Sequence, residues 1–331
     1  MQRSEAAGDG RARTPRTDSA EAVLERLLGR LTLRGKSLII TVFGDAIMPH
    51  GGRAWLGSLI RLVQPLGLSE RMVRTAVFRL TRDDWLEATP IGRRSYYSLT
   101  ESGRHRFEAA HRRIYQARRT AWDGVWHLVV VPADLPQLRR DELRRELGWL
   151  GFGQMAPNVL AHPAPDAEAL RQTLLDLRLG DKVPVMNGSA DPASPSAPLR
   201  KLTAQCWDLA RLESDYEGFL ETFRPVRRAM ESVGSLDPEL CFLVRILLIH
   251  DYRRVLLRDP LLPDELLPTS WAGLAARALC RNLYRLTLQP AERHLMSLLE
   301  TPDGPAPEAA PFFHSRFAVP AEGVAEERAR A

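Results

Sequence analysis

Cysteine is scarce, and the few cysteines lie too far apart to form a metal site or a disulfide framework. The 331 residues include only Cys206, Cys241 and Cys280, without a Cys-x-x-Cys pair or a neighbouring group of histidines. Zinc sites and disulfide-stapled domains depend on closer, repeated spacings. We therefore expect a protein of the reducing cytoplasm that carries no metal and no other resident cofactor.

The chain also lacks a long apolar run. Its first residues, MQRSEAAGDGRARTPRTDS, contain no apolar stretch of the kind that forms a signal peptide. The most apolar segment, CFLVRILLIHDY, is interrupted by Arg245, His250 and Asp251. It is shorter than the ~20 residues that span a bilayer. These features predict a soluble protein without a membrane partner.

Lysine is nearly absent, so arginine carries the positive charge, and this charge is unevenly distributed. Lys and Arg together number 46 and Asp and Glu 41, which gives a net charge of +5. Residues 1–121 contain 22 basic and 12 acidic residues, a net +10, whereas the remainder, with 24 and 29, carries −5. A basic segment joined to an acidic one is typical of a chain whose basic part contacts a polyanion.

The basic first third alternates apolar periods with turn residues, which predicts short helices and strands. Residues 37–47 fit a strand by local preference and a helix by context. Ser69 precedes an acidic first turn, which is the pattern of a helix N-cap. From the N-terminus we expect a flexible tail with a short helix capped by Asp18 or Ser19 (1–33), helices over 54–63 and 70–82, strands over 85–88 and 95–99, and a basic helix from about 100 to 118.

A helix, a short turn, a second helix and a hairpin follow one another here in the chain order of a winged helix-turn-helix, which we assign to 34–121. In that motif the second helix enters the major groove of DNA. A helical phase of ~100° per residue places Val73, Ala76, Val77 and Leu80 on one side of 70–82. Candidate contacts to the bases and phosphates of double-stranded operator DNA are on the other side and at the hairpin tip. They are Ser69, Arg71, Arg74, Thr75, Phe78, Arg79, Arg82, Arg93 and Arg94.

The alternative interpretation is that these arginines form only a solvated helix face and that Phe78 packs beneath the hairpin. A lone basic helix favours that alternative. Here the next helix adds Arg104, Arg106, Arg112 and Arg113. This accumulation of positive charge favours contact with DNA.

The rest of the chain divides by periodicity into a mixed part and a helical part. Residues 122–198 show a strand–helix–strand–strand–helix–strand order, which predicts a ferredoxin-like α/β sandwich that ends in a linker over 187–198. Helical periods dominate 199–300, and 301–331, rich in Pro, Ala and Glu, is expected to be disordered. The predicted fold class is α+β.

Long stretches of the sequence follow the pattern of a known family. The first is SLIITVFGDAIMPHGGRAWLGSLIRLVQPLGLSERMVRTAVFRLTRDDWL, followed by GRRSYYSLTESGRHRFE. Further matches are WDGVWHLVVV, LRRELGWLGFGQMAPNVLAHP, LIHDYRRVLLRDPLLPDELLP and LYRLTLQPAERHL. These segments, which run in order from about Leu33 to Leu299, closely resemble the PaaX family of negative regulators of phenylacetic acid degradation operons.

The resemblance implies a homodimeric repressor with an N-terminal winged helix, a middle domain similar in fold to Cas2 and a helical C-terminal domain. It also implies phenylacetyl-coenzyme A as the effector that releases operator DNA. Another operon or another acyl-coenzyme A is the alternative that the resemblance leaves open.

An acyl-coenzyme A needs cations for its phosphates and an apolar slot for its acyl group. Candidate residues for this effector site are His250, Arg253, Arg254 and Arg258. The alternative for these four is a surface network of i,i+4 charges. The glycine-rich stretch 148–153 lacks the Gly-x-Gly-x-x-Gly order of a phosphate loop, so a turn explains it better. The tryptophans at 122, 126, 149 and 207 are expected in the core or at an interface.

An enzyme is the main rival class. A Cas2-like domain acting as a metal-dependent nuclease would need carboxylates that converge at a strand end. Asp134 follows a predicted strand, but we expect it to cap the next helix, and no partner carboxylate stands out. The sequence contains no Walker loop and no His-Glu-x-x-His motif. We therefore expect no enzymatic activity.

Overall fold

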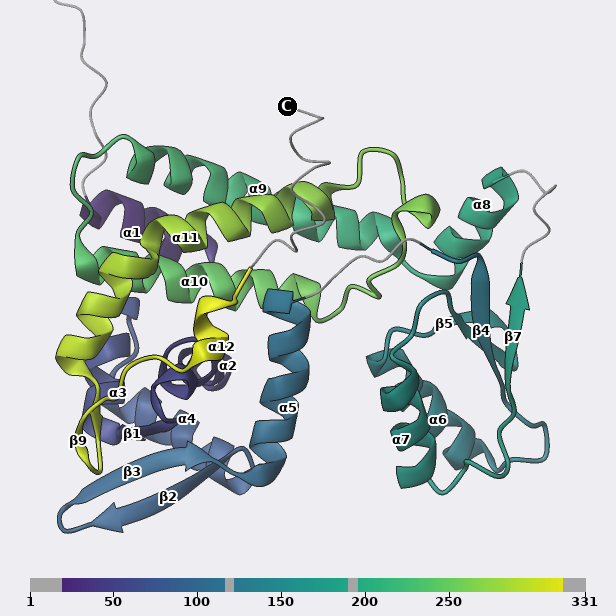
Figure 1. Ribbon diagram of the computed structural model, residues 1–331, viewed down its shortest axis with the longest axis horizontal. Helices are drawn as coiled ribbons and strands as arrows, with labels where there is room; N and C mark the ends of the chain where they lie inside the picture. Colours follow the sequence, from purple (N-terminus) through teal and green to yellow (C-terminus); the bar gives the residue numbers. More distant parts are fainter. Residues whose placement is uncertain (1–19, 117–121, 190–195, 318–331) are drawn as a thin grey trace, which may run out of the picture.

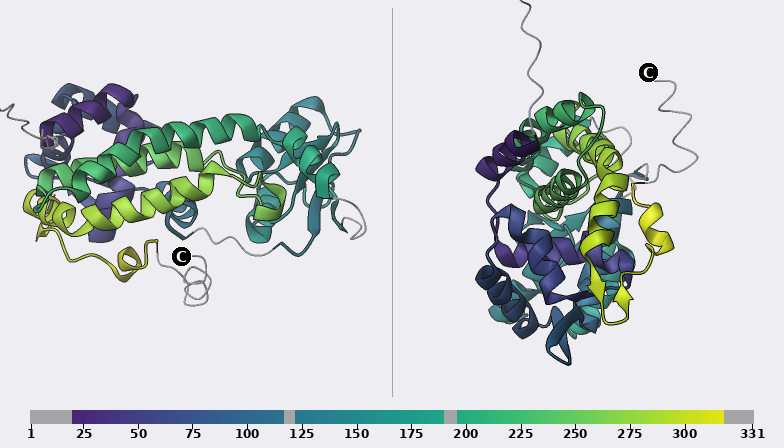
Figure 2. Two further views of the ribbon diagram at one scale, coloured as in Figure 1. Left: turned by 90° about the horizontal axis from the view of Figure 1, so that it is seen from above. Right: turned by 90° about the vertical axis from the view of Figure 1, so that its left-hand side faces the viewer.

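Three long helices lie side by side and carry the rest of the fold (Figures 1 and 2). They are α9 (Leu209–Glu231), α10 (Pro238–Leu256) and α11 (Ala272–Leu298), which we call the helical body. The computed structural model describes residues 20–116, 122–189 and 196–317. The predicted N-terminal tail with its caps Asp18 and Ser19, residues 190–195 of the predicted linker, and the disorder predicted for 318–331 lie outside the described residues. No helix within these ranges is both long and apolar enough to cross a membrane.

A region of short helices and one sheet, which we call the head (35–116), lies beneath the helical body in Figure 1. Its sheet has the antiparallel order β1–β3–β2. Helix α2 continues as a π-helical turn over Phe43–Ile47, and α5 continues as another over Arg112–Gln116. The elements are α2 (Gly35–Val42), β1 (Arg53–Trp55), α3 (Leu56–Val63), α4 (Glu70–Arg82), β2 (Leu86–Ile91), β3 (Arg94–Leu99) and α5 (Glu101–His111).

The structure resolves one ambiguous segment of the head and corrects two predicted boundaries, one of which is that the first strand of the hairpin runs to Ile91 instead of ending at residue 88. The ambiguous segment 37–47 is helical, because Leu38, Ile39 and Val42 are enclosed by the core and have no exposed surface. The helix predicted to begin at residue 54 begins instead at Leu56. Residues 53–55 pair with β3, with Ala54 opposite Tyr97, and this pairing holds them in an extended conformation.

The head and the helical body share one hydrophobic core. Buried side chains of α2 and α4, such as Leu38 and Val73, belong to the same cluster as Phe223 of α9, Leu247 of α10 and Leu283 of α11. The short helix predicted within 1–33 is α1 (Ala20–Arg30), and it packs on this body through Val23 and Leu27. Burial of apolar surface stabilises such a core by roughly 25 cal/mol per Å². The head is therefore packed as part of a larger unit.

A buried cluster of charges fastens the head to the body. Asp45 of the head lies 2.9 Å from Nε of Arg245 on α10, and its Oδ1 lies 3.3 Å from Nη1 of Arg316. Arg245 also contacts Glu292 of α11 at 2.6 Å, and the hydroxyl of Tyr115 donates to Asp45 at 2.7 Å. Asp45, Arg245 and Arg316 are at most 5% exposed. Charges this deeply buried are tolerated because each has a partner of opposite sign.

The segment that supplies Arg316 was expected to be disordered, and that expectation is wrong for residues 301–317. The chain forms a small hairpin, β8 (Glu300–Thr301) with β9 (Gly304–Pro305), and then α12 (Pro311–His314). Phe313 and Phe317 are buried, and the carbonyl of Pro307 accepts a hydrogen bond from Nδ1 of His50 at 2.7 Å. The content of Pro, Ala and Glu suggested disorder. The order was not predictable because several of the residues that anchor this segment bind partners more than 200 positions earlier in the chain.

A smaller unit of strands and helices, the middle unit (122–189), lies at the other end of the molecule (Figure 1). Its four antiparallel strands have the order β5-β6-β4-β7. Two helices cover one face through Leu143, Leu147, Leu170 and Leu174. Helix α8 (Ser196–Cys206) follows the unit, and Pro198, assigned to the predicted linker, lies within it. The elements of the unit are β4 (Val125–Val130), α6 (Gln137–Trp149), β5 (Gly153–Ala156), β6 (Val159–His162), α7 (Ala167–Asp176) and β7 (Val185–Ser189).

Candidate nucleic-acid interface and a pocket between three parts of the chain

Helix α4 presents one apolar face to the core and one polar face to solvent. Ser69 is its N-cap, and the hydroxyl of Ser69 accepts a hydrogen bond from the amide of Met72 at 3.4 Å. The four apolar residues that the helical phase placed together, Val73, Ala76, Val77 and Leu80, are all buried. The predicted phase of the helix is therefore confirmed.

The outward face of α4 is basic and carries one large aromatic side chain. Phe78 is 68% exposed, so the alternative in which it packs beneath the hairpin is wrong. A large exposed apolar side chain amid charge is typical of a binding surface. The other side chains predicted on this face are also exposed: Ser69, Arg71, Arg74, Thr75, Arg79 and Arg82.

Internal ion pairs divide these arginines into two groups. Arg74 lies 2.7 Å from Glu70, one turn earlier, and Arg82 lies 3.3 Å from Asp83. Among the described residues, Arg71, Arg79 and Arg93 form no ion pair. Exposed pairs are weak, so a phosphate group can displace them. The unpaired arginines, Arg71, Arg79 and Arg93, are therefore more readily available to an anion than Arg74 and Arg82.

The β2–β3 hairpin projects beside this face of the head (Figure 1). Its turn consists of Gly92, with φ +58°, and Arg93, and Ile91 pairs with Arg94 across it. A glycine at the first turn position suits the backbone that a two-residue hairpin needs. Arg93 is thus exposed at the tip.

Arg94 is held back from the tip, although the sequence placed it beside Arg93. Its guanidinium lies 4.2 Å from the ring centre of Trp55 and 2.6 Å from Glu300. Glu300 also binds Arg61 at 2.8 Å. Hydrogen bonds from Arg61 and Arg94 lower the pKa of Glu300. The C-terminal segment therefore braces the β2–β3 hairpin beside its turn.

The arginines of the α5 region do not all face outward. Arg104 and Arg112 are exposed, and Arg106 stacks 5.1 Å from the ring centre of Trp85. Arg113 turns toward the body and donates hydrogen bonds to the carbonyls of Leu256 and Asp259. Three of the four predicted basic residues of this helix thus remain on the outer surface of the head.

The four residues predicted for the effector site do not converge on one cavity. His250 is 5% exposed with Nδ1 3.1 Å from the Thr41 hydroxyl, and burial lowers its pKa to about 4. Arg253 donates to the carbonyl of Ser37 and to the hydroxyl of Thr41, so both residues attach α10 to α2. Arg254 pairs with its neighbour Asp251. Arg258 lines a pocket that contains none of the other three.

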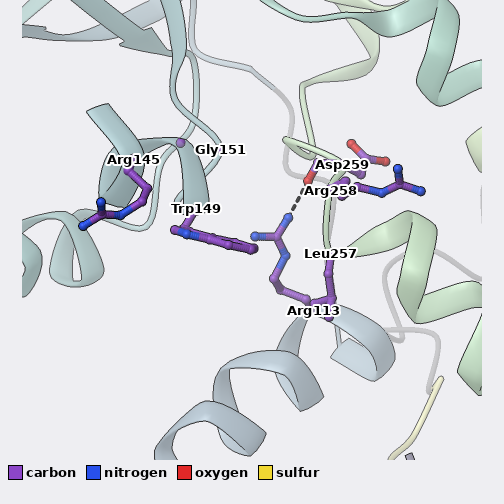
Figure 3. Close-up of a pocket in the computed structure, with 8 residues that line it drawn as sticks. Arg113, Arg145, Trp149, Gly151, Leu257, Arg258 and Asp259 are labelled. Carbon is purple, nitrogen blue, oxygen red and sulfur yellow. Dashed lines mark hydrogen bonds between the residues drawn. The ribbon is translucent and has the colours of Figure 1, made fainter. Parts of the chain in front are cut away.

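That pocket, of about 380 Å³, opens where three parts of the chain meet (Figure 3). The turn after α5, the end of α6 and the end of α10 each supply part of its wall. Trp149, which was expected in the core or at an interface, is 67% exposed and so lies outside the core, whereas Trp122, Trp126 and Trp207 pack together. The lining residues are Arg113, Arg145, Gly148, Trp149, Gly151, Leu257, Arg258 and Asp259.

Sequence reasoning missed this pocket because each of its three segments reads as an ordinary helix end. The glycines at 148 and 151 were the available signal, and they were interpreted as a simple turn. In the structure Gly151 has φ +92°, and a Cβ there would lie 3.3 Å from Pro260 of the loop after α10. Glycine thus permits the close approach of the middle unit to the body.

The described residues contain no group of three or more His, Cys, Asp or Glu side chains placed to hold a metal ion. Asp134 is exposed, and it does not cap the helix as predicted. Helix α6 begins at Gln137 with Pro136 at the N-cap position. The intervening prolines at 132 and 136 displace the helix start from the strand end.

Comparisons with known proteins agree over most of the chain. Residues 34–103, 119–199 and 207–297 match the family descriptions PaaX-like protein, PaaX protein central Cas2-like domain and PaaX-like protein C-terminal domain. The chain is 38% identical over 298 residues to the transcriptional repressor PaaX of Escherichia coli K12, which covers 90% of this chain and 94% of that protein. An uncharacterized protein from Mycobacterium tuberculosis has a similar fold, with a TM-score of 0.51 and 23% identity over 77% of this chain and 96% of that one. The chain belongs to the PaaX family of transcriptional repressors.

Proposed function

We propose that the protein represses genes of phenylacetate catabolism in the cytoplasm by binding operator DNA through a winged helix-turn-helix in its head. Helix α4 would be the recognition helix and the β2–β3 hairpin the wing. The observation that carries the proposal is the outward face of α4, where exposed arginines surround Phe78, 68% exposed, beside a hairpin with Arg93 at its tip. Membership of the PaaX family of repressors supports the same assignment.

The chemistry of the exposed face suits a duplex. Arginine can bond both acceptors of guanine, and an aromatic ring can contact the methyl group of thymine in the major groove. The capped N-terminus of α4 at Ser69 offers free amides to a phosphate. Arg71, which has no internal ion pair within the described ranges, is our first candidate for a base contact, and Arg93 for a phosphate contact.

We further propose that the protein binds as a homodimer and that an acyl-coenzyme A, phenylacetyl-coenzyme A by family resemblance, releases it. A single recognition helix covers a short site, and two-fold symmetry doubles the sequence that is read. The middle unit is Cas2-like, and its strand order supports a ferredoxin-like sandwich. We assign it and the helical body to sensing and assembly, without catalysis.

A mobility-shift titration on the DNA upstream of the protein's own gene tests the proposal. We expect a specific protein–DNA complex. Phenylacetyl-coenzyme A should dissociate this complex, whereas free phenylacetate and unrelated acyl thioesters should leave it intact. Lack of binding to this DNA would contradict the proposal that the protein represses genes next to its own. Cleavage of the DNA in the presence of Mg²⁺ would contradict the assignment of a purely regulatory role.

A pair of variants separates base reading from phosphate contact. Arg71→Ala should weaken binding to the operator by about 1–3 kcal/mol and leave random DNA almost unaffected, as expected for a bidentate base contact. Arg93→Ala should weaken binding to both sequences alike and reduce the dependence on salt. Arg171→Ala, which removes an exposed arginine of α7 far along the chain from the head, serves as the control. Equal losses on both DNAs for Arg71→Ala would assign that residue to the phosphates.

A further inference from the structure

The pocket between the head, the middle unit and the body contains an excess of positive charge. Arg113, Arg145 and Arg258 line it, and Asp259 is the only acidic residue of the lining. The carboxylate of Asp259 is already occupied, since it accepts hydrogen bonds from the hydroxyl of Tyr216 at 2.6 Å and the amide of Leu261 at 2.7 Å. Asp259 attracts Arg113, but one carboxylate against three arginines leaves the lining with a net positive charge.

Arg113 is the most deeply placed of these cations. Its Nη2 donates to two main-chain carbonyls at the end of α10, and its Nε is buried without a hydrogen-bond partner among the described residues. Burial lowers the pKa of Arg113. An anion in the pocket would offset that desolvation by pairing with the guanidinium. The carboxylates near the other two arginines, Glu146 and Asp215, bind them from outside the lining at 3.2 Å and 3.1 Å.

Trp149 gives the pocket a flat apolar wall. Its ring extends from the end of α6 toward the guanidinium of Arg113 (Figure 3). A tryptophan that is 67% exposed is unusual, because so large an apolar side chain is normally covered. An indole ring beside a planar guanidinium forms a platform on which an aromatic ring can stack.

The dimensions suit a small molecule. About 380 Å³ falls within the ~300–1,000 Å³ of ordinary ligand pockets. Gly148 leaves open space beside Trp149, since a Cβ at that position would meet no atom within 4 Å. The pocket thus combines cations, an aromatic wall and room at one place.

We propose that this pocket binds a ligand that joins an aromatic ring to phosphate groups, as a nucleotide does. The ring stacks on Trp149 and Arg113 contacts the nearest phosphate, while Arg145 and Arg258, whose side chains extend away from Arg113 on either side (Figure 3), add positive charge around the pocket. The inference deepens the proposed function and rests on it in one respect: an acyl-coenzyme A contains an adenine nucleotide and is the natural occupant. Because the three walls come from the end of the head, the middle unit and the body, an occupant bridges all three.

Calorimetric titration of the full chain with ADP, adenosine and inorganic pyrophosphate tests the chemistry. We expect ADP to bind at least tenfold more tightly than either adenosine or pyrophosphate, because only ADP presents both the ring and the phosphates. Absence of ADP binding at millimolar concentration would overturn the proposal. So would equal binding of ADP and adenosine, which would leave the arginines without a role.

Two variants locate the site. Arg145→Ala and Trp149→Ala should each weaken ADP binding at least fivefold, and neither residue is needed for the contacts that Arg113 makes with the body. The matched controls are Arg171→Ala, an exposed arginine of the same unit, and Leu138→Ala, an apolar residue of α6 that is 79% exposed. Unchanged thermal unfolding verifies that each variant folds. ADP binding that survives both pocket variants would overturn the assignment.

The same preparations separate this inference from the proposed function. Retention of operator binding without any ADP binding would refute the pocket while repression stands. Release of DNA by phenylacetyl-coenzyme A from Arg145→Ala and Trp149→Ala at wild-type concentrations would place the effector elsewhere. Loss of operator binding with normal ADP binding would refute the DNA-binding proposal and leave the pocket intact.

Discussion

The middle unit and the head are both small assemblies of strands and helices, yet they are attached to the helical body in different ways. The middle unit has its own hydrophobic cluster, formed by residues such as Val129, Leu143 and Leu170. The head has none of its own, because its buried residues belong to the cluster of α9, α10 and α11. Size alone therefore does not make a region an independent domain.

The seams differ in the same way. The head is joined to the body by shared core and by fully buried charges around Asp45. The middle unit contacts the loop after α10 through a small apolar cluster, in which Trp126 and Ala161 pack with Leu266, and through polar bonds such as that from His162 to the carbonyl of Pro260 at 3.0 Å. A motion between parts of this protein should therefore occur at the middle unit rather than at the head.

The largest expected effect comes from Asp45→Ala. This change leaves Arg245 and Arg316 buried without their shared anion, and removal of one partner of a buried ion pair costs about 3–5 kcal/mol. Hydrogen exchange in urea should show the head and body unfolding early, with the middle unit unaffected. Glu168→Ala, which breaks only an exposed pair with Arg171, is the control and should cause no measurable change. Equal destabilisation of all three regions would show that the chain unfolds as one unit.

Leu143→Ala makes the converse test. Leu143 is fully buried in the middle unit, and such truncations cost about 2–5 kcal/mol through the cavity they create. We expect faster hydrogen exchange in β4, α6 and α7 and unchanged binding of the operator by the head. Leu138→Ala on the same helix, with an exposed side chain, should change neither. A loss of operator binding proportional to the loss of stability would contradict the separation of the two regions.

A fall in pH should weaken the contact between the middle unit and the loop after α10. The amide of Ala164 donates to Nδ1 of His162, so the neutral ring carries its proton on Nε2 and donates it to Pro260. Burial, and less strongly the charge of Arg113, lower the pKa of His162 to about 4, although the bond to Pro260 opposes the shift. The unfolded side chain titrates near 6.5, so the unfolded state binds more protons in this window and stability falls as pH drops from about 6.5 to 4.

The contribution of His162 amounts to roughly 3 kcal/mol over that window at about 1.4 kcal/mol per pKa unit. Unfolding of the wild type and of His162→Asn, measured at pH 7 and pH 4.5, isolates it. The variant should lose less stability on acidification than the wild type. Identical pH profiles would exclude His162 as a source of acid sensitivity.

The smallest expected effect concerns the contact of Glu300 with Arg94 beside the turn of the β2–β3 hairpin. Glu300→Gln removes the charge that holds Arg94 and Arg61 at the surface. Binding to random DNA at low salt should become a few times tighter, because Arg94 is then free to reach a phosphate. The control is Asp303→Asn, which changes an exposed acid between β8 and β9 that lies 3.9 Å from Arg53. Weaker binding by Glu300→Gln would instead indicate that the brace holds the hairpin in its binding position.

A structural feature could be predicted from the sequence when the residues that form it lie close together along the chain. The face of α4 was predictable because its apolar residues repeat within one helix and Ser69 marks its start. The strand at 53–55 was not, because its partner β3 lies some 40 residues later and the apolar spacing also fits a helix.

The pocket was out of reach for the same reason. Arg113, Trp149 and Arg258 come from three separate helix ends, and no local pattern relates them. The predicted effector residues His250 and Arg253 were chosen for their clustered charge. Their actual role follows from Thr41 and Ser37 in a helix more than 200 residues earlier.

The contact of Asp45 with Arg316 also has a consequence during synthesis. The two residues are 271 positions apart, so the head leaves the ribosome long before its neutralising partner is translated. Contacts of such long sequence separation slow folding and expose apolar surface in the meantime. The nascent head therefore remains incompletely packed until the residues around Arg316 have been synthesised.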